Sequence, residues 1–183
     1  GKKLYRVACG HEDAWNETLM REAVGQMDGL SVHYYCHADS WRRKGPATGF
    51  PVAEWYSLLK SALGIEGFIR RTRTIMDRYD PAGRVGMVMD EWGTWHDVEP
   101  GTNPGFLYQQ NTLRDAVVAC LTLNILNHHA DRVHMANIAQ TVNVLQAMVL
   151  TDGPRMLLTP TYHVFEMMKV HQEAAYLPMH QED

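Results

Sequence analysis

The chain has 183 residues, of which 45% are hydrophobic and 21% are charged, and its formal net charge is −4. These values are typical of one globular domain with its own core. The chain has no basic cluster and no apolar stretch long enough to span a bilayer, so we expect neither a nucleic-acid partner nor a membrane partner. The three widely spaced cysteines favour buried thiols over a disulfide framework. The first ten residues are too polar for a signal peptide, and we therefore expect a cytoplasmic protein.

Short apolar runs alternate with longer segments whose apolar residues recur at helical spacing. The predicted elements, in chain order, are a strand at 4–9, a helix at 17–27, a strand at 29–36, a helical region at 53–79, a strand at 84–91, a helix at 108–130, a strand at 131–139, a helix at 140–150 and a helix at 159–174. The region 53–79 is either one helix or two, with a break near Gly64 and Gly67. This alternation predicts a parallel α/β sheet covered by helices, either an open doubly wound sheet or half of a (β/α)8 barrel.

Polar and aromatic residues lie at the ends of three of the four predicted strands. The second strand ends in His33, Tyr34 and Tyr35, the third ends in Asp90 and Glu91 before Trp92 and Trp95, and the fourth leads to Asn137 and Gln140. Each has an ordinary structural explanation when taken singly, because acids cap helices and aromatic residues pack in cores. Together, at the functional end of a parallel sheet, they are the residue types of a sugar site. A carboxylate there can attack or stabilise an oxocarbenium-like centre.

Four segments carry a resemblance to a known family. They are GLSVHYY (29–35), MDEWGTW (89–95), HADRVHMANIAQTVNVLQAM (129–148) and LLTPTYHVFEMMKVHQ (157–172). Through them the chain resembles the family 51 glycoside hydrolases, the α-L-arabinofuranosidases. These enzymes remove terminal α-L-arabinofuranosyl residues from arabinan, arabinoxylan or arabino-oligosaccharides with retention of configuration. The resemblance implies that residues 1–183 are part of a (β/α)8 TIM barrel catalytic domain, covering about strands 5 to 8 with their helices.

The resemblance also assigns roles to five residues. Glu91 matches the catalytic nucleophile, and His33 and Tyr35 match a His-x-Tyr pair around the nucleophile and the sugar. Trp95 matches an aromatic wall of the furanose pocket, and Gln140 matches a glutamine that binds a sugar hydroxyl. The resemblance implies double displacement, with no metal and no organic cofactor.

The family's general acid/base belongs to an Asn-Glu pair at the end of the fourth barrel strand, and we expect it to lie outside this chain. Asn16-Glu17 does not fit that pair, because it follows the first predicted strand at the start of a helix, where Glu17 is a first-turn acid. Strand alternation predicts that Asp90 points away from the side of Glu91, so we do not expect Asp90 to be catalytic.

The expected partners are an arabinofuranosyl-containing oligo- or polysaccharide and the missing N-terminal half-barrel segment. We also expect a homo-oligomer, because a half barrel exposes two sheet edges and an apolar interior. The alternatives are another retaining glycosidase of the same clan, such as a β-xylosidase or endoglucanase, and a non-catalytic fragment that binds sugar or assists assembly. A metal hydrolase is disfavoured: His128-His129 closes a helix, and His163 and His171 share no carboxylate at ligand spacing.

Overall fold

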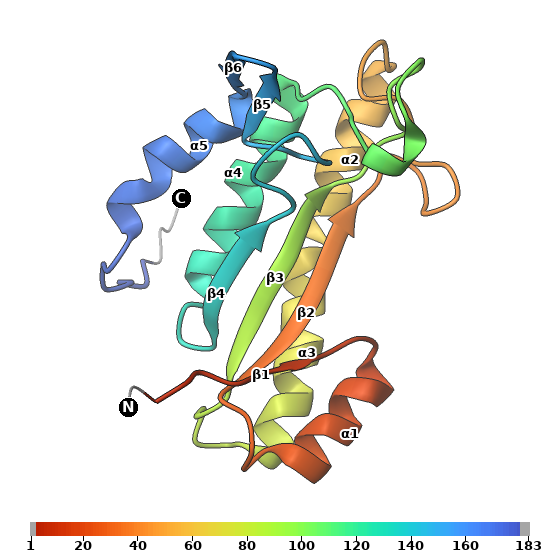
Figure 1. Cartoon of the computed structure of the whole chain (residues 1–183). Helices are drawn as coiled ribbons and strands as arrows, with labels where there is room; N and C mark the ends of the chain where they lie inside the picture. The colour runs from red at the N-terminus through yellow and green to blue at the C-terminus, as the bar shows by residue number, and fades with distance from the viewer. Residues whose placement is uncertain (1–2, 180–183) are drawn as a thin grey trace.

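A four-stranded parallel sheet forms the centre of the protein (Figure 1). The computed structural model describes residues 3–179. The strands are β1 (Val7–Cys9), β2 (Gly29–Cys36), β3 (Gly86–Thr94) and β4 (Val133–Ile138). They pair in chain order, with β1 beside β2, β2 beside β3 and β3 beside β4, and every pair is parallel. The prediction of an α/β fold with a parallel sheet is confirmed.

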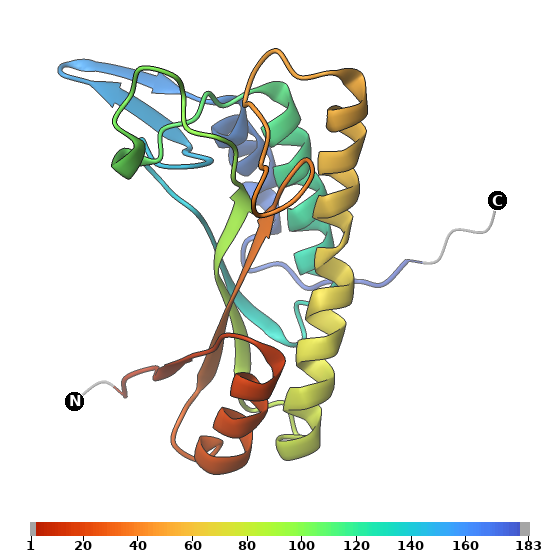
Figure 2. The ribbon, with the colours of Figure 1, turned by 90° about the vertical axis from the view of Figure 1, so that its right-hand side faces the viewer.

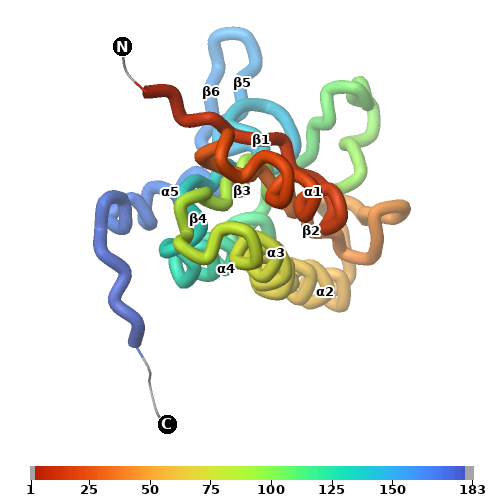
Figure 3. Tube along the Cα trace, turned by 90° about the horizontal axis from the view of Figure 1, so that it is seen from below, coloured from red at the N-terminus to blue at the C-terminus, as the bar shows by residue number. Residues whose placement is uncertain are grey.

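Helices fill the connections and lie mainly on one side of the sheet, as Figure 2 shows. They are α1 (Asp13–Ala23), α2 (Val52–Leu63), α3 (Ile65–Tyr79), α4 (Leu113–His128) and α5 (Pro160–Met168), with 3-10 turns at Pro104–Phe106 and Lys169–His171. From below, Figure 3 shows α2, α3 and α4 together on one side of β2 and β3. The core lies between these layers. Among its fully buried members are Leu30, Val32, Ile65, Ile69, Met76, Met87 and Met89.

The helical region 53–79 divides into two helices that meet at Gly64. A Cβ atom at this position would lie 2.5 Å from the Tyr34 hydroxyl oxygen, which is closer than such contacts occur. Glycine is therefore required where the helix pair passes over β2. Gly67, the other suggested break, lies inside α3.

The prediction of a helix at residues 140–150 is wrong. The chain there forms an irregular loop and then an antiparallel hairpin of β5 (Val149–Asp152) and β6 (Arg155–Leu158). Asn143 and Leu145 have φ angles of 60° and 51°, which an α-helix cannot contain. Gly153 has φ of 56° and begins the two-residue turn, so an Asp-Gly-Pro sequence was the missed hairpin signal.

The described residues form an open sheet rather than a closed barrel, and both β1 and β4 are edge strands of it. None of the helices in residues 3–179 is long and apolar enough to cross a membrane.

Candidate active site

Glu91 lies inside β3, and its carboxylate meets two side chains from β2. The Tyr35 hydroxyl donates a hydrogen bond of 2.7 Å to Glu91 Oε2. His33 Nδ1 lies 3.5 Å from the same oxygen. His33 and Tyr35 are two residues apart on one strand and therefore leave it on the same face. The structure thus joins Glu91, His33 and Tyr35, three of the predicted site residues, through polar contacts.

The expectation that Asp90 points away from Glu91 is wrong, because β3 contains a β-bulge. Val32 pairs with Met89, yet the next residue, His33, pairs with Glu91, so Asp90 is an extra residue in β3. His33 Nε2 lies 3.2 Å from Asp90 Oδ1, and the Ser31 hydroxyl donates to that oxygen at 2.9 Å. Two neighbouring carboxylates therefore flank one imidazole. We call Ser31, His33, Tyr35, Asp90 and Glu91 the Glu91 cluster.

Aromatic rings form a wall beside the cluster. The Trp95 ring contacts Tyr35 edge to face, with the ring centroids 5.0 Å apart. Trp41, from the loop after β2, contacts Trp95 in the same manner at 5.0 Å. The Lys44 ammonium lies 4.8 Å from the Trp41 ring centroid. Sequence reasoning missed Trp41; the signal was a tryptophan in a polar loop directly after a strand that carries site residues.

Two aromatic residues from the predicted set face the helices instead. Trp92 is 1% exposed and stacks on Phe165 of α5, with the centroids 5.9 Å apart. The Tyr34 hydroxyl donates to the Ser61 carbonyl of α2 at 2.7 Å. Both residues alternate with members of the Glu91 cluster, so strand geometry directs them into the core.

Tyr35 is a hydrogen-bond donor rather than a base. Burial raises the pKa of its hydroxyl far above the usual value of 10, and the hydrogen bond to Glu91 adds to that rise. Burial likewise raises the pKa of Tyr34 to about 12. The Tyr35 proton therefore remains available to the Glu91 carboxylate throughout the neutral range.

Gln140 lies at the same end of the sheet as Glu91. Ile138 of β4 pairs with Trp92, and Gln140 follows two residues later, where it is exposed. Its backbone N–H donates to the Val144 carbonyl at 3.1 Å. Within the described residues, no hydrogen bond joins its side chain to the Glu91 cluster. Asn137, also named from the sequence, is likewise exposed at the end of β4.

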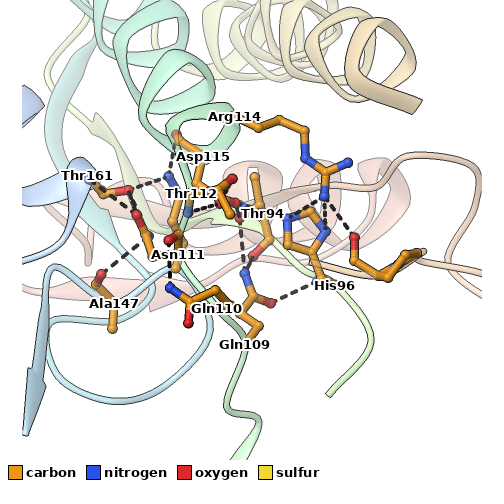
Figure 4. Close-up of polar contacts among 12 residues, drawn as sticks. Thr94, His96, Gln109, Gln110, Asn111, Thr112, Arg114, Asp115, Ala147 and Thr161 are labelled. Atoms are coloured by element: carbon orange, nitrogen blue, oxygen red, sulfur yellow. Dashed lines mark hydrogen bonds and ion pairs between the residues drawn. The ribbon is translucent and has the colours of Figure 1, made fainter. Parts of the chain in front are cut away.

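A buried network of polar side chains lies between the end of β3 and the start of α4 (Figure 4). Asp115, near the start of α4, accepts hydrogen bonds from the Thr94 hydroxyl at 2.6 Å, the Thr112 N–H at 2.7 Å and the Thr112 hydroxyl at 3.0 Å, and His96 Nε2 lies 2.9 Å from it. Burial alone would raise the pKa of Asp115, but these contacts, led by His96, outweigh it and lower the pKa. The network connects the end of β3 to the N-terminus of α4.

Asn16 and Glu17 lie within α1, seven and eight residues after the last residue of β1. Helix α1 begins at Asp13, so Glu17 is in its second turn rather than its first, and the expected role as a first-turn acid is wrong. The Arg78 guanidinium donates to the Glu17 carboxylate at 2.7 Å. Glu17 is therefore a surface ion-pair partner at the α1–α3 contact.

Two of the four histidines considered as metal ligands, His129 and His163, have single acidic partners. His129 Nε2 lies 2.9 Å from a Glu66 oxygen, and His163 Nδ1 lies 3.3 Å from a Glu166 oxygen. In the part of the chain that the structure describes, no three His, Cys, Asp or Glu side chains gather as a metal site.

A groove of about 810 Å³ lies between the loop after β3 and the β5–β6 hairpin. Its lining includes Phe106, Tyr108, Asn143, Arg155 and Leu157, and no member of the Glu91 cluster contributes to it. The groove is therefore distinct from the Glu91 cluster. Its lining residues come from the chain segments that follow Trp95 and Gln140.

Comparison with known proteins places the chain among the glycoside hydrolases. Residues 90–183 match the family described as the alpha-L-arabinofuranosidase C-terminal domain, and the chain belongs to this family. It is 49% identical to an intracellular exo-alpha-L-arabinofuranosidase of Bacteroides ovatus over 98% of this chain and 35% of that protein. It is 28% identical to an intracellular exo-alpha-(1->5)-L-arabinofuranosidase of Streptomyces lividans over 80% of this chain and 23% of that protein.

Solved structures give the same assignment. The GH51 arabinofuranosidase of Xanthomonas axonopodis pv. citri superimposes with a TM-score of 0.90 and 52% identity, over 92% of this chain and 35% of that one. The alpha-L-arabinofuranosidase of Thermotoga maritima, solved as an arabinose complex, gives a TM-score of 0.73 and 25% identity, over 90% of this chain and 31% of that one. The chain therefore spans about a third or less of the length of these relatives. All of them are named arabinofuranosidases, so the comparisons do not favour the alternative of a β-xylosidase or endoglucanase.

Proposed function

We propose that this chain supplies the nucleophile and part of the sugar pocket of a retaining, exo-acting α-L-arabinofuranosidase. The observation that carries the proposal is the carboxylate of Glu91, held by the Tyr35 hydroxyl at 2.7 Å beside His33. A nucleophile must stay ionised and keep one orientation, and both contacts serve that purpose. The substrates would be terminal α-L-arabinofuranosyl residues of arabinan, arabinoxylan or arabino-oligosaccharides.

The reaction would proceed by double displacement. The Glu91 carboxylate attacks the anomeric carbon while the glycosidic C–O bond breaks and a second carboxyl group protonates the leaving oxygen. A covalent arabinosyl ester forms on Glu91. The second group, now a carboxylate, then takes a proton from water, which attacks the anomeric carbon and releases arabinose with retained configuration. The two carboxyl groups of such an enzyme lie about 5–5.5 Å apart.

In this proposal the general acid/base lies outside this chain, and Asp90 orients His33. Asp90 Oδ1 already accepts from the Ser31 hydroxyl and lies 3.2 Å from His33 Nε2, which fixes the ring that faces Glu91. Trp95 would form the apolar wall of the furanose pocket, and Gln140 would bind a sugar hydroxyl from the end of β4.

We further propose that residues 1–183 are the second half of a (β/α)8 catalytic domain, covering strands 5 to 8. Four parallel strands in chain order, with helices mainly on one side and two free edges, support this arrangement. The greater length of the relatives supports a partner segment that completes the barrel and carries the acid/base. Self-association and a cytoplasmic location remain expectations, and the second agrees with relatives that are named intracellular.

The test is the pre-steady-state release of nitrophenol from 4-nitrophenyl α-L-arabinofuranoside by this chain. Nitrophenol is a good leaving group, so the first step needs little acid assistance. We expect a stoichiometric burst that Glu91→Ala abolishes and that Asp90→Asn retains in amplitude but at a lower rate, because Asp90 orients His33. A folded chain without a burst would favour the non-catalytic fragment. Sustained turnover by the chain would contradict an acid/base located elsewhere.

A further inference from the structure

Gln146 is the buried residue that joins the two loops carrying predicted sugar-binding groups. It is 0% exposed and lies in the irregular segment between β4 and β5. Its Oε1 accepts from the Thr94 N–H at 2.8 Å. Its Nε2 donates to the Asp115 carbonyl at 2.7 Å and to the Thr161 hydroxyl at 3.1 Å. Both amide hydrogens and one acceptor oxygen are therefore used, each by a different element.

The backbone of Gln146 contributes a fourth contact. Its N–H donates to the Ala139 carbonyl at 3.1 Å, directly before Gln140. The Ala139 N–H in turn donates to the Trp92 carbonyl at 3.0 Å, next to Glu91. One residue thus holds the chain immediately before Trp95 and immediately before Gln140.

The shape of β3 depends on the same side chain. Gly93 has φ of 143°, a conformation that L side chains rarely adopt, and a Cβ atom there would lie 3.0 Å from Gln146 Oε1. Beyond Gly93, the Trp95 N–H donates to the Cys36 carbonyl of β2 at 3.1 Å. The turn that directs Trp95 toward Tyr35 is therefore held from β2 on one side and by Gln146 on the other.

We infer that Gln146 is a positioning residue, which fixes Trp95 and Gln140 relative to Glu91 through its hydrogen bonds to Thr94 and Asp115. The catalytic part of this inference rests on the proposed function, whereas the positional part does not. A side chain that served only to fill space would not need three hydrogen bonds directed to three separate elements. Figure 4 labels Thr94, Asp115 and Thr161, the three residues to which the Gln146 side chain is hydrogen-bonded.

The test compares Gln146→Met with Thr161→Val. Methionine keeps the volume but removes all three side-chain hydrogen bonds. Valine at Thr161 removes one of the three and leaves the bond to Thr94 in place. The chain is labelled with 5-fluorotryptophan, and the Trp95 signal is assigned by Trp95→Phe. We expect Gln146→Met to shift or broaden the Trp95 fluorine resonance and Thr161→Val to leave it unchanged.

A Trp95 resonance that is unaltered in folded Gln146→Met would overturn the inference. If that variant does not fold, hydrogen exchange of the wild-type chain decides: the Thr94 amide must be strongly protected, and exchange at the rate of an open loop would overturn it.

Kinetics of the full-length enzyme give the functional readout. We expect Gln146→Met to lower kcat/KM for the nitrophenyl arabinoside by about 10- to 100-fold, since small displacements of positioning groups have effects of this order. The kcat/KM of Thr161→Val should stay within about twofold of the wild type, although this variant loses the buried hydrogen bonds of the Thr161 hydroxyl to Gln146 and Asn111. Equal losses in both variants would indicate a merely structural role and would overturn the inference. A wild-type enzyme inactive on arabinofuranosides would instead refute the proposed function, while the fluorine measurement would still test the positioning.

Discussion

Removal of the Tyr35 hydroxyl tests the contact on which the proposed nucleophile depends. In Tyr35→Phe the 2.7 Å hydrogen bond to Glu91 Oε2 is lost, while the ring keeps its edge-to-face contact with Trp95. The matched control is Tyr34→Phe. It removes a bond of the same length, to the Ser61 carbonyl, from the neighbouring residue on the opposite face of β2.

The magnitude follows from the type and exposure of the bond. A hydrogen bond to a charged group contributes about 1.5–3 kcal/mol. The Glu91 side chain is 41% exposed, so water partly screens the interaction and the lower end applies, roughly 1.5–2 kcal/mol. If Tyr35 aligns and activates the nucleophile in the transition state, this corresponds to a fall in kcat/KM of about 10- to 30-fold. The control should lose about 1 kcal/mol of folding stability and keep its kcat/KM.

The assay is steady-state hydrolysis of 4-nitrophenyl α-L-arabinofuranoside by the full-length enzyme, with urea unfolding of each variant. Tyr35→Phe with kcat/KM within about twofold of the wild type would show that the Tyr35 hydroxyl does not assist Glu91, and so would an equal loss in Tyr34→Phe.

Three further results are expected. Trp92→Ala should lower the free energy of unfolding by about 3–5 kcal/mol, measured by urea denaturation, because a fully buried indole stacked on Phe165 is removed; a loss below about 1 kcal/mol would contradict this packing. The pKa of Asp115 is lowered in the folded protein, so its carboxylate contributes fully to the free energy of unfolding above pH 3.8, the reference pKa. This contribution is lost as the pH falls below that value. Asp115→Asn should cost about 3 kcal/mol at pH 7 and show a smaller drop in stability between pH 5 and 2 than the wild type, and an unchanged acid profile would refute that assignment. Trp41→Ala should raise KM by up to about tenfold and change kcat less, because the edge-to-face support of Trp95 is removed; an unchanged KM would count against this contact.

Much of the fold could be predicted because each strand and helix shows its own period. The strand at 29–36 was predicted with its observed bounds, and Gly64 was one of two suggested breaks in 53–79. Strand β3 extends to Thr94, beyond the predicted end at residue 91, because polar residues inside a strand resemble its termination.

The site was predicted less completely, and the reasons are geometric. The family resemblance placed Glu91 with His33 and Tyr35, but strand alternation failed at Asp90, where the bulge adds one residue and reverses the alternation. No local pattern reveals such a bulge, because pairing with β2 produces it.

The segment after β4 could not be predicted for a related reason. Residues 140–150 have helical spacing of apolar residues, but tertiary hydrogen bonds hold them in a loop. The Leu145 N–H donates to the Leu107 carbonyl at 3.0 Å, and Gln146 is bound to three other elements. Contacts between distant parts of the chain override the local period here.

Locating the covalent intermediate tests most directly whether Glu91 is the nucleophile. The enzyme is quenched in acid during the nitrophenol burst, digested and analysed by peptide mass spectrometry. We expect one arabinosyl ester, on Glu91, which is absent from Glu91→Ala. An ester on Asp90, or turnover that gives the inverted anomer with no ester at all, would contradict this expectation.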